Sequence, residues 1–417
     1  MNPTAAILAF AAAPHRLPEA AANDVRRLVR DTLAVAIAGS TAPGTEAVLK
    51  AARAMGTGAD APLLGRAERL PAPGAAMVNG FQIHCLEWDA VHEPGVVHAM
   101  SVVTAAVHAT AHRLGGAEDD DVLAALCVGV EIACLLGVAA TTPLRFFRPA
   151  TAGVMGAALA CGRLMGLSNL DDVLGLAHAQ AAGTMQAHVE GSIALPVQVA
   201  LAARAAVTAA DLAAAGILAP HDVLEGPFGY MQLFDRGDLA PHVAGLGTAW
   251  RVSEISVKPW PSGRASHGLL SVLEGRGKAG RVEAHVPPLV ARLVGRPWVD
   301  GMTPAYARLC LPFLASLMMV DGHINPRRFT PATFADARLQ ALGARLSIVV
   351  DGNPDLNALS PQRIVVDGES IVVSATPGSP AAPLSAAQQA AKEALALSLA
   401  AAPAPFDPLA LLTGKTA

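Results

Sequence analysis

The chain has 417 residues, of which 53% are hydrophobic, 15% charged and 4% aromatic, with a formal net charge of −4 at pH 7. Its length suggests two or three domains around a large core, and its apolar content excludes a disordered chain. The absence of a basic surplus argues against a nucleic-acid partner. Five cysteines without short pairings predict reduced core thiols and a cytoplasmic protein.

Residues 18 to about 247 have a helical pattern, in which Ala-rich stretches alternate with Gly, Pro, Asn and Asp. The most apolar stretch, residues 122–141, contains Glu131 and is built largely on Ala and Gly. It is therefore interpreted as a buried helix rather than a membrane span, and we expect no membrane partner. The N-terminus lacks the pattern of a secretion signal.

The pattern changes after about residue 250. Residues 252–257 are predicted to form a strand, 286–294 and 304–320 to form helices, and 345–350, 363–366 and 370–375 to form strands. Asp367 and Gly368 separate the last two runs, which is typical of a tight hairpin. The tail from Ser385 is Ala-rich and helical, and we expect it to pack on the first domain.

These patterns predict a large all-α helical domain with a smaller α+β domain. The helical domain spans residues 1–255 and is completed by residues 385–417. The α+β domain spans residues 256–384.

The densest polar cluster lies in residues 79–98. Its titratable members are His84, Glu87, Asp89, His92, Glu93 and His98. Imidazole titrates near neutral pH and a neighbouring carboxylate fixes its tautomer, so the cluster suits general acid–base catalysis. A metal site is the rival interpretation, since these side chains are also metal ligands. The third interpretation is that these residues are solvated loop residues or buried structural histidines without a catalytic role.

Two further segments carry candidate binding groups. Residues 256–267 form a Pro-stiffened loop in which Lys and Arg side chains could hold carboxylates; the alternative is a surface hinge. Residues 146–158 open a helix whose free N–H groups favour anions. Close helix packing through Gly153 and Gly156 is the alternative there. The sequence contains no G-x-S-x-G, P-loop, H-E-x-x-H, C-x-x-C or dinucleotide-binding fingerprint.

The first cluster resembles the signature of the MmgE/PrpD family, an N-G followed by H-x-L-D-F-D-D-T-H and a further His. Here Asn79-Gly80 precedes a segment that runs from His84 to His92, and His98 follows. Four more stretches are similar to the family in the same order, at residues 31–40, 224–229, 258–267 and 377–385. The family includes 2-methylcitrate dehydratases, cis-aconitate decarboxylases and iminodisuccinate epimerases.

The resemblance implies a large all-α domain, an α+β lid inserted before the last helices, and a homodimer. It also implies a site between the domains that acts on small di- and tricarboxylic acids. This site would use no cofactor, and in particular no metal, nucleotide or flavin. Several family positions differ here. Glu87 replaces an Asp, Phe313 replaces a Tyr, and residues 146–149 lack a His, where Arg148 could supply one lost positive charge.

The resulting hypothesis is a cofactor-independent lyase of the dehydratase or hydratase type, acting on a small di- or tricarboxylic acid such as a 2-methylcitrate-like compound. The alternatives are an epimerase or isomerase, a decarboxylase of a small dicarboxylate, and a non-catalytic carboxylate-binding paralogue. The predicted catalytic residues are His98, Glu87, Asp89, His92 and Lys258. The predicted substrate-binding residues are Arg264, His267, Ser262 and Arg148.

His98 is the lead base or acid in this hypothesis, oriented by Glu87 or Asp89, with His92 as a second acid. We expect His98 and Lys258 to face one cleft. Replacing either with Ala should then abolish most turnover and leave the thermal melt nearly unchanged.

Overall fold

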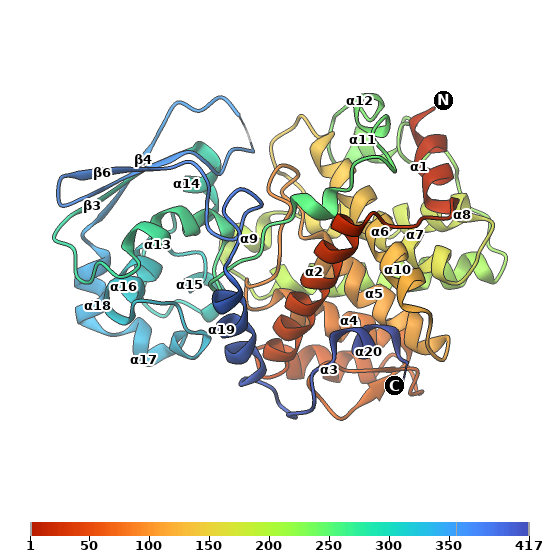
Figure 1. Ribbon diagram of the computed structural model, residues 1–417, viewed down its shortest axis with the longest axis horizontal. Helices are drawn as coiled ribbons and strands as arrows, with labels where there is room; N and C mark the ends of the chain where they lie inside the picture. Colours follow the sequence, from red (N-terminus) through yellow and green to blue (C-terminus); the bar gives the residue numbers. More distant parts are fainter. Residues whose placement is uncertain (1, 356, 416–417) are drawn as a thin grey trace.

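The computed structural model describes residues 2–355 and 357–415. It is mostly helical, with a small mixed sheet in the C-terminal region (Figure 1). The elements of the helical part are α1 (Pro3–Ala12), α2 (Glu19–Gly39), α3 (Thr45–Arg53), β1 (Ala61–Pro62), β2 (Arg69–Leu70), α4 (Ala72–His84), α5 (Ala99–Arg113), α6 (Asp119–Val138), α7 (Arg148–Leu164), α8 (Leu170–His178), α9 (Gln186–Glu190), α10 (Ala194–Ala214), α11 (Tyr230–Leu233) and α12 (Ala240–Val243).

Small residues let the central helices approach closely. A Cβ atom added at Gly156 of α7 would lie 2.1 Å from the carbonyl oxygen of Gly129 on α6, so the two backbones touch there. Ala side chains along both helices are fully buried. The packing explanation for Gly156 is therefore the one that the structure supports, and it accounts for the high Ala and Gly content of this part.

Two helices, α6 and α10, are long and apolar enough to cross a membrane by length and composition alone. In α6, 89% of the apolar window is buried inside the protein, whereas in α10 the share is 56%. The prediction of a buried helix at residues 122–141 is thus confirmed, with bounds Asp119–Val138. All five cysteines are buried free thiols, as predicted.

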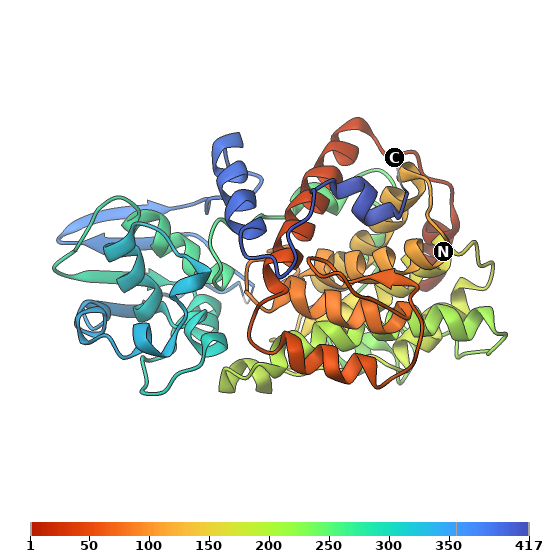
Figure 2. The same ribbon diagram turned by 90° about the horizontal axis from the view of Figure 1, so that it is seen from below.

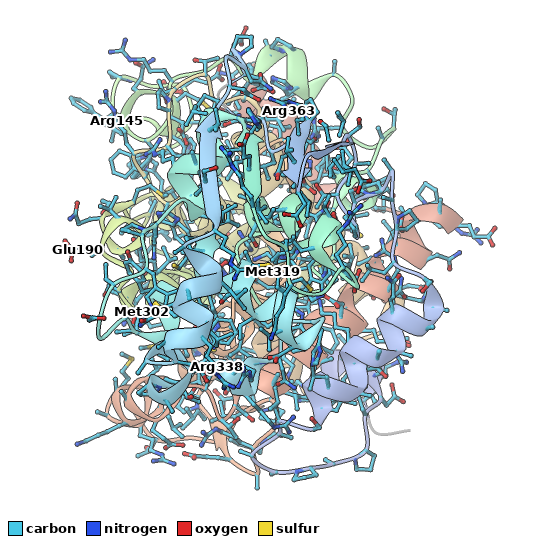
Figure 3. The ribbon with its side chains drawn as sticks, turned by 90° about the vertical axis from the view of Figure 1, so that its left-hand side faces the viewer. Arg145, Glu190, Met302, Met319, Arg338 and Arg363 are labelled. Carbon is cyan, nitrogen blue, oxygen red and sulfur yellow. The ribbon has the colours of Figure 1, made fainter. Side chains whose placement is uncertain are left out.

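The smaller part places a sheet on one side of a group of short helices. Its elements are η1 (Arg251–Glu254), η2 (Arg264–Ser266), α13 (His267–Leu273), β3 (Val282–Val286), α14 (Pro288–Val294), α15 (Pro304–Ala307), α16 (Leu311–Asp321), η3 (Pro326–Arg328), α17 (Pro331–Phe334), α18 (Ala337–Gly343), β4 (Leu346–Val350), β5 (Gln362–Val366) and β6 (Glu369–Val373). Figure 3 views this part from outside, with Met319 of α16 and Arg338 of α18 below Arg363 of β5.

The strand order is β4-β3-β5-β6, with β3 parallel to β4 and antiparallel to β5. The hairpin β5–β6 is confirmed. Its turn residues Asp367 and Gly368 have φ values of 50° and 92°, the left-handed conformations that a type I′ turn requires.

Two predictions in this part are wrong. Residues 252–257 form a 3-10 helix and one isolated bridge between Ser256 and Val91, because no neighbouring strand is available to pair with them. Residues 304–320 form two helices, α15 and α16, rather than one, and the predicted helix at 286–294 is preceded by strand β3.

The tail returns to the helical part as α19 (Ala386–Leu397) and α20 (Pro408–Thr413). Ser385 begins α19 with a capping box, and the helix lies against α2 in both views (Figures 1 and 2). Its Lys392 is buried, with Nζ 2.6 Å from Oδ1 of Asp31 on α2, and donates a hydrogen bond to the carbonyl of Trp88. The last helices thus hold the loop that carries the first polar cluster.

Candidate active site

A pocket with an empty volume of about 640 Å³ lies where residues of the two parts meet. The helical part contributes polar groups from the loop between α4 and α5, and the smaller part contributes η2, α14 and Leu359. Most of the wall is apolar. The apolar lining residues are Val91, Val96, Leu144, Phe147, Pro149, Met185, Leu195, Ala265, Leu293, Val294, Leu309 and Leu359.

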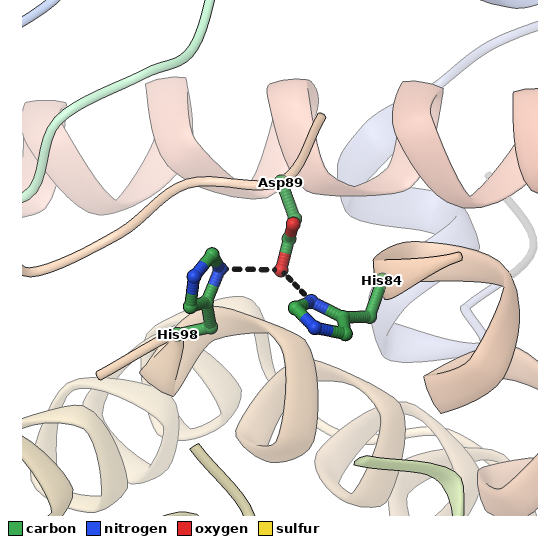
Figure 4. Close-up of side chains that lie close together, drawn as sticks. All are labelled: His84, Asp89 and His98. Carbon is green, nitrogen blue, oxygen red and sulfur yellow. Dashed lines mark hydrogen bonds and ion pairs between the residues drawn. The ribbon is translucent and has the colours of Figure 1, made fainter. Parts of the chain in front are cut away.

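Asp89 is the centre of the polar cluster at this pocket (Figure 4). It is fully buried, and its Oδ2 accepts hydrogen bonds from His84 Nδ1 at 2.8 Å, His98 Nδ1 at 2.9 Å and Ser101 Oγ at 2.5 Å. Because each histidine uses Nδ1 on Asp89, its Nε2 is the nitrogen left to act on a ligand. His84 and His98 both line the pocket.

The loop between α4 and α5 places these groups. His84 is the last residue of α4, and His98 immediately precedes α5, so both histidines are anchored to rigid helix ends. Between them, Glu87 and Val96 have φ values of 52°, a left-handed conformation that is costly for a residue with a side chain. Such strain is concentrated at functional sites, where surrounding contacts hold it.

Lys258 joins this cluster from the other part of the chain. Its Nζ lies 3.2 Å from Oε2 of Glu87, 3.1 Å from the Glu87 carbonyl oxygen and 3.6 Å from Oδ1 of Asp89. His98 and Lys258 therefore meet on the same carboxylate. Lys258 is fully buried behind the pocket rather than in its wall, so the expectation that its loss leaves the thermal melt unchanged has no basis.

The two histidines have pKa shifts of opposite sign. Burial alone would lower the pKa of His84, but the charges of Asp89 and Glu87 outweigh it and raise that pKa overall. Burial lowers the pKa of His98, and the nearby Lys258 ammonium lowers it further. Despite its burial, the pKa of Asp89 is held well below its usual range by both histidines and Lys258. The two directions favour protonation of His84 over protonation of His98.

Two arginines that line the pocket already carry carboxylate partners. Arg148 is fully buried and donates from Nε and Nη2 to the two oxygens of Asp235, each at 3.1 Å. Arg264 donates from Nε to Glu93 at 2.9 Å and from its Nη atoms to two backbone carbonyls. Both can contact a ligand, but neither brings an uncompensated charge to it.

Three of the remaining predicted residues, His92, Ser262 and His267, lie outside the pocket wall. His92 is fully buried, with Nε2 2.8 Å from Oε2 of Glu254 and Nδ1 accepting from the Gly95 amide. Ser262 and His267 are fully buried and hydrogen-bonded to each other at 3.0 Å, and burial holds the pKa of His267 well below its usual value. Glu87 lines the pocket.

Three polar residues of this pocket, His84, Glu93 and His188, and Arg308 beside it were not among the predicted site residues. His84 belonged to the predicted cluster but was given no catalytic role, although its spacing to His98 was visible. His188 lines the pocket, and burial lowers its pKa to about 4. Arg308 lies next to the pocket within an apolar run, and a lone Arg in such a run is the signal that could have found it.

The same cluster is the strongest candidate for a cation site among the described residues. Donor atoms of His84, Asp89 and His98 all lie within 4.8 Å of one another. Both histidines are already hydrogen-bonded to Asp89. The Lys258 ammonium lies 3.6 Å from Asp89, and its positive charge would repel a metal cation bound there. The donor set therefore fits proton transfer better than metal binding.

Comparison with known proteins identifies relatives along most of the chain. The model of the MmgE/PrpD N-terminal domain matches residues 6–242, and that of the C-terminal domain matches residues 278–401. The chain is 29% identical to a cis-aconitate decarboxylase of Aspergillus terreus. The alignment covers 62% of the present chain and 56% of the Aspergillus protein. It thus spans little more than half of that relative.

The human and mouse cis-aconitate decarboxylases are each 24% identical to the chain. The human protein aligns over 80% of this chain and 74% of its own length, and the mouse protein over 73% and 66%. The two matching domain models cover the helical part and the sheet-containing part in the order that the fold shows. The chain therefore belongs to the MmgE/PrpD family.

Proposed function

We propose that the protein is a cofactor-independent lyase of a small di- or tricarboxylic acid, of the dehydratase or hydratase type. The observation that carries this proposal is the pair of histidines on Oδ2 of Asp89, with pKa shifts of opposite sign, at the wall of a mostly apolar pocket. Elimination of water needs one group to take a proton and another to give one, and this pair supplies both.

In the proposed reaction, Nε2 of neutral His98 takes the proton on the carbon next to a substrate carboxylate. The C–H electron pair forms the new double bond as the β-hydroxyl leaves with a proton from His84. Water and an unsaturated acid are released, and His98 and His84 exchange their protons with solvent. Asp89 is a positioning residue, because it holds both rings in one tautomer and stabilises the imidazolium.

Decarboxylation is the second candidate, favoured by the apolar wall and by the names of the relatives. A carboxylate that enters a mostly apolar pocket loses hydration, which favours release of neutral CO₂. Here the C–C electron pair would stay on the substrate carbon, and protonated His84 would deliver the proton to it. Both reactions use the same residues and differ in which bond breaks.

We also propose that residues 256–384 act as a lid domain over the helical domain, 1–255 with 385–417. The support is that Gly263, Arg264 and Leu293 line the same pocket as His84 and His98. A lid that closes on substrate would exclude water from the reacting bond.

Proton NMR in deuterated water with a panel of di- and tricarboxylic acids tests the proposed function. Gain or loss of alkene signals without loss of carbon supports a dehydratase. Release of bicarbonate, followed by carbon-13 NMR of the same samples, supports a decarboxylase. Deuterium uptake without net conversion would replace both with an epimerase. A silent panel would leave a carboxylate-binding protein. Running the panel before and after chelator treatment, with His98→Gln as control, tests the proposed independence from metal.

A further inference from the structure

A second, smaller cavity adjoins the active-site pocket. Its empty volume is about 270 Å³, and His84, Glu87, Leu195 and Leu309 line both cavities. Arg296 and Arg308 from the smaller part of the chain also line it. A ligand that reaches from one cavity into the other would pass His84 and Glu87.

Arg308 is a buried cation without a counter-ion. It is 2% exposed, and its guanidinium forms no hydrogen bond or ion pair with any residue in the described ranges 2–355 and 357–415. Arg296 is 8% exposed. Its Nη2 donates to the His188 carbonyl, while its Nη1 has no partner among the same residues. A buried charge with unpartnered N–H groups is costly, and that cost marks both arginines as candidates for binding an anionic ligand.

Aromatic rings hold the two guanidinium groups by their faces. Arg308 lies over the ring of Phe329 with its Cζ 4.7 Å from the ring centroid, and Arg296 lies over the ring of Tyr306 at 5.2 Å. Stacking occupies a face of each group and leaves its N–H edge for a planar acceptor. Gly191 leaves room here, since a Cβ on it would lie 2.9 Å from Nη1 of Arg296.

The charges around the two cavities do not balance without a ligand. Asp235 compensates Arg148, Glu93 compensates Arg264, and Glu87 pairs with Lys258 at 3.2 Å. Arg296 and Arg308 form no ion pair among the described residues. The Glu87 carboxylate lines the same cavity and attracts both, but its ion pair is with Lys258. Two uncompensated arginines beside an acid–base pair suit an anion, and a guanidinium edge matches a carboxylate bidentately.

We infer that Arg296 and Arg308 form a subsite for the second carboxylate of a dicarboxylate whose reacting end lies at His98. This inference rests on the proposed function for the position of the reacting end, and it names the part of the substrate that the smaller cavity selects. A monocarboxylate of the same length would leave the arginines uncompensated and bind weakly.

Calorimetric titration of the whole protein with succinate and with butyrate tests the subsite without any need for turnover. The wild type should bind succinate more tightly than butyrate. Arg308→Gln should weaken succinate binding by about tenfold to a hundredfold, which is the contribution expected of charge-assisted hydrogen bonds. The same variant should change butyrate binding by less than about twofold. Arg53→Gln, at an exposed ion pair with Glu68, is the matched control and should change neither.

Equal binding of the two acids by the wild type, or equal losses for both in Arg308→Gln, would overturn the subsite. If Arg308→Gln fails to fold, Arg296→Lys serves instead, because it keeps the charge and removes the planar fork. The two proposals fail separately. Succinate binding that depends on Arg308 without turnover of any acid would overturn the lyase and leave the subsite standing, whereas turnover with no preference for succinate would do the reverse.

Discussion

The rings of His84 and His98 meet edge to face, with centroids 4.8 Å apart and an interplanar angle of 78°, and both bind one oxygen of Asp89. Two like groups so close cannot both carry a charge without repulsion, so one proton between them is the favoured state at neutral pH. Asp89 raises the pKa of both rings, and the charge of Glu87 at His84, against burial and Lys258 at His98, gives two identical side chains opposite pKa shifts.

The pH dependence of kcat/KM should be bell-shaped. His98 has a lowered pKa and must be neutral, so the rate rises as pH increases through that pKa, below the usual value for histidine. His84 has a raised pKa and must be protonated, so the rate falls as pH increases through a value above the usual one. His84→Gln should remove the alkaline limb. A wild-type profile that stays flat above neutral pH would contradict the assignment.

Asp89→Asn should reduce kcat by about a hundredfold or more, because a neutral amide oxygen is a weaker acceptor for the two Nδ1–H groups and lacks the charge that stabilises an imidazolium. Ser101→Ala is the matched control, since it removes the third donor to the same oxygen and leaves both histidines in place. We expect it to cost less than about tenfold. Steady-state kinetics on folded variants measures both, and equal losses would argue against the orienting role of Asp89.

Lys258→Met should destabilise the protein by about 3 kcal/mol, because it leaves the carboxylates of Glu87 and Asp89 buried with less compensating charge. Urea denaturation followed by circular dichroism gives the free energy of unfolding. Lys50→Met, near the exposed end of α3, should change it by less than about 0.5 kcal/mol. A lysine variant as stable as the wild type would mean that the ammonium is not needed to balance the cluster.

Gly156→Ala should lower the free energy of unfolding by about 1–3 kcal/mol, since the added methyl would meet the backbone of α6. Gly56→Ala is the control, because no atom lies within 4 Å of the Cβ it would add, and it should be neutral or slightly stabilising. Similar values for both variants would show that α6 and α7 separate easily.

We expect a homodimer formed through the helical part. Helix α10 is strongly apolar, yet part of its surface is exposed to solvent. The exposed apolar side chains on α9, on α10 and just before α10 are Val189, Ile193 and Leu201. Covering such a surface with a second copy would remove it from water. Light scattering at micromolar concentration should give twice the mass of one chain, and Leu201→Glu should shift the protein toward monomer. A wild-type monomer would refute the expectation.

Local sequence patterns predicted the parts of the fold that depend on neighbours along the chain. Asp367-Gly368 specifies its own hairpin turn, and the spacing from His84 to His98 already gathers the acid–base groups on one loop. Lys258 could be connected to that loop through the family resemblance. Its burial between two carboxylates could not be predicted, because that depends on how the two parts of the chain pack.

The errors have the same cause. The alternation in residues 252–257 fits a strand, but a strand also needs a partner, and the structure offers Ser256 a single bridge to Val91. Arg308 was missed because the apolar residues around it predict only core. The role proposed for it depends on its stacking against Phe329 and on the lack of an ion-pair partner among the described residues. Both depend on the packing of the folded chain and cannot be deduced from the local sequence.

The hydrogen bond from Lys392 to the carbonyl of Trp88 joins positions 304 residues apart, beside the loop that carries Asp89. The loop is therefore synthesised long before Lys392. The four strands β3 to β6 are synthesised between the two. During synthesis the early helices can collapse before α19 exists, but this contact on their loop cannot form until α19 has been made. The segment beside the acid–base centre, although encoded in the first quarter of the chain, therefore lacks one of its contacts until nearly the whole chain has been synthesised.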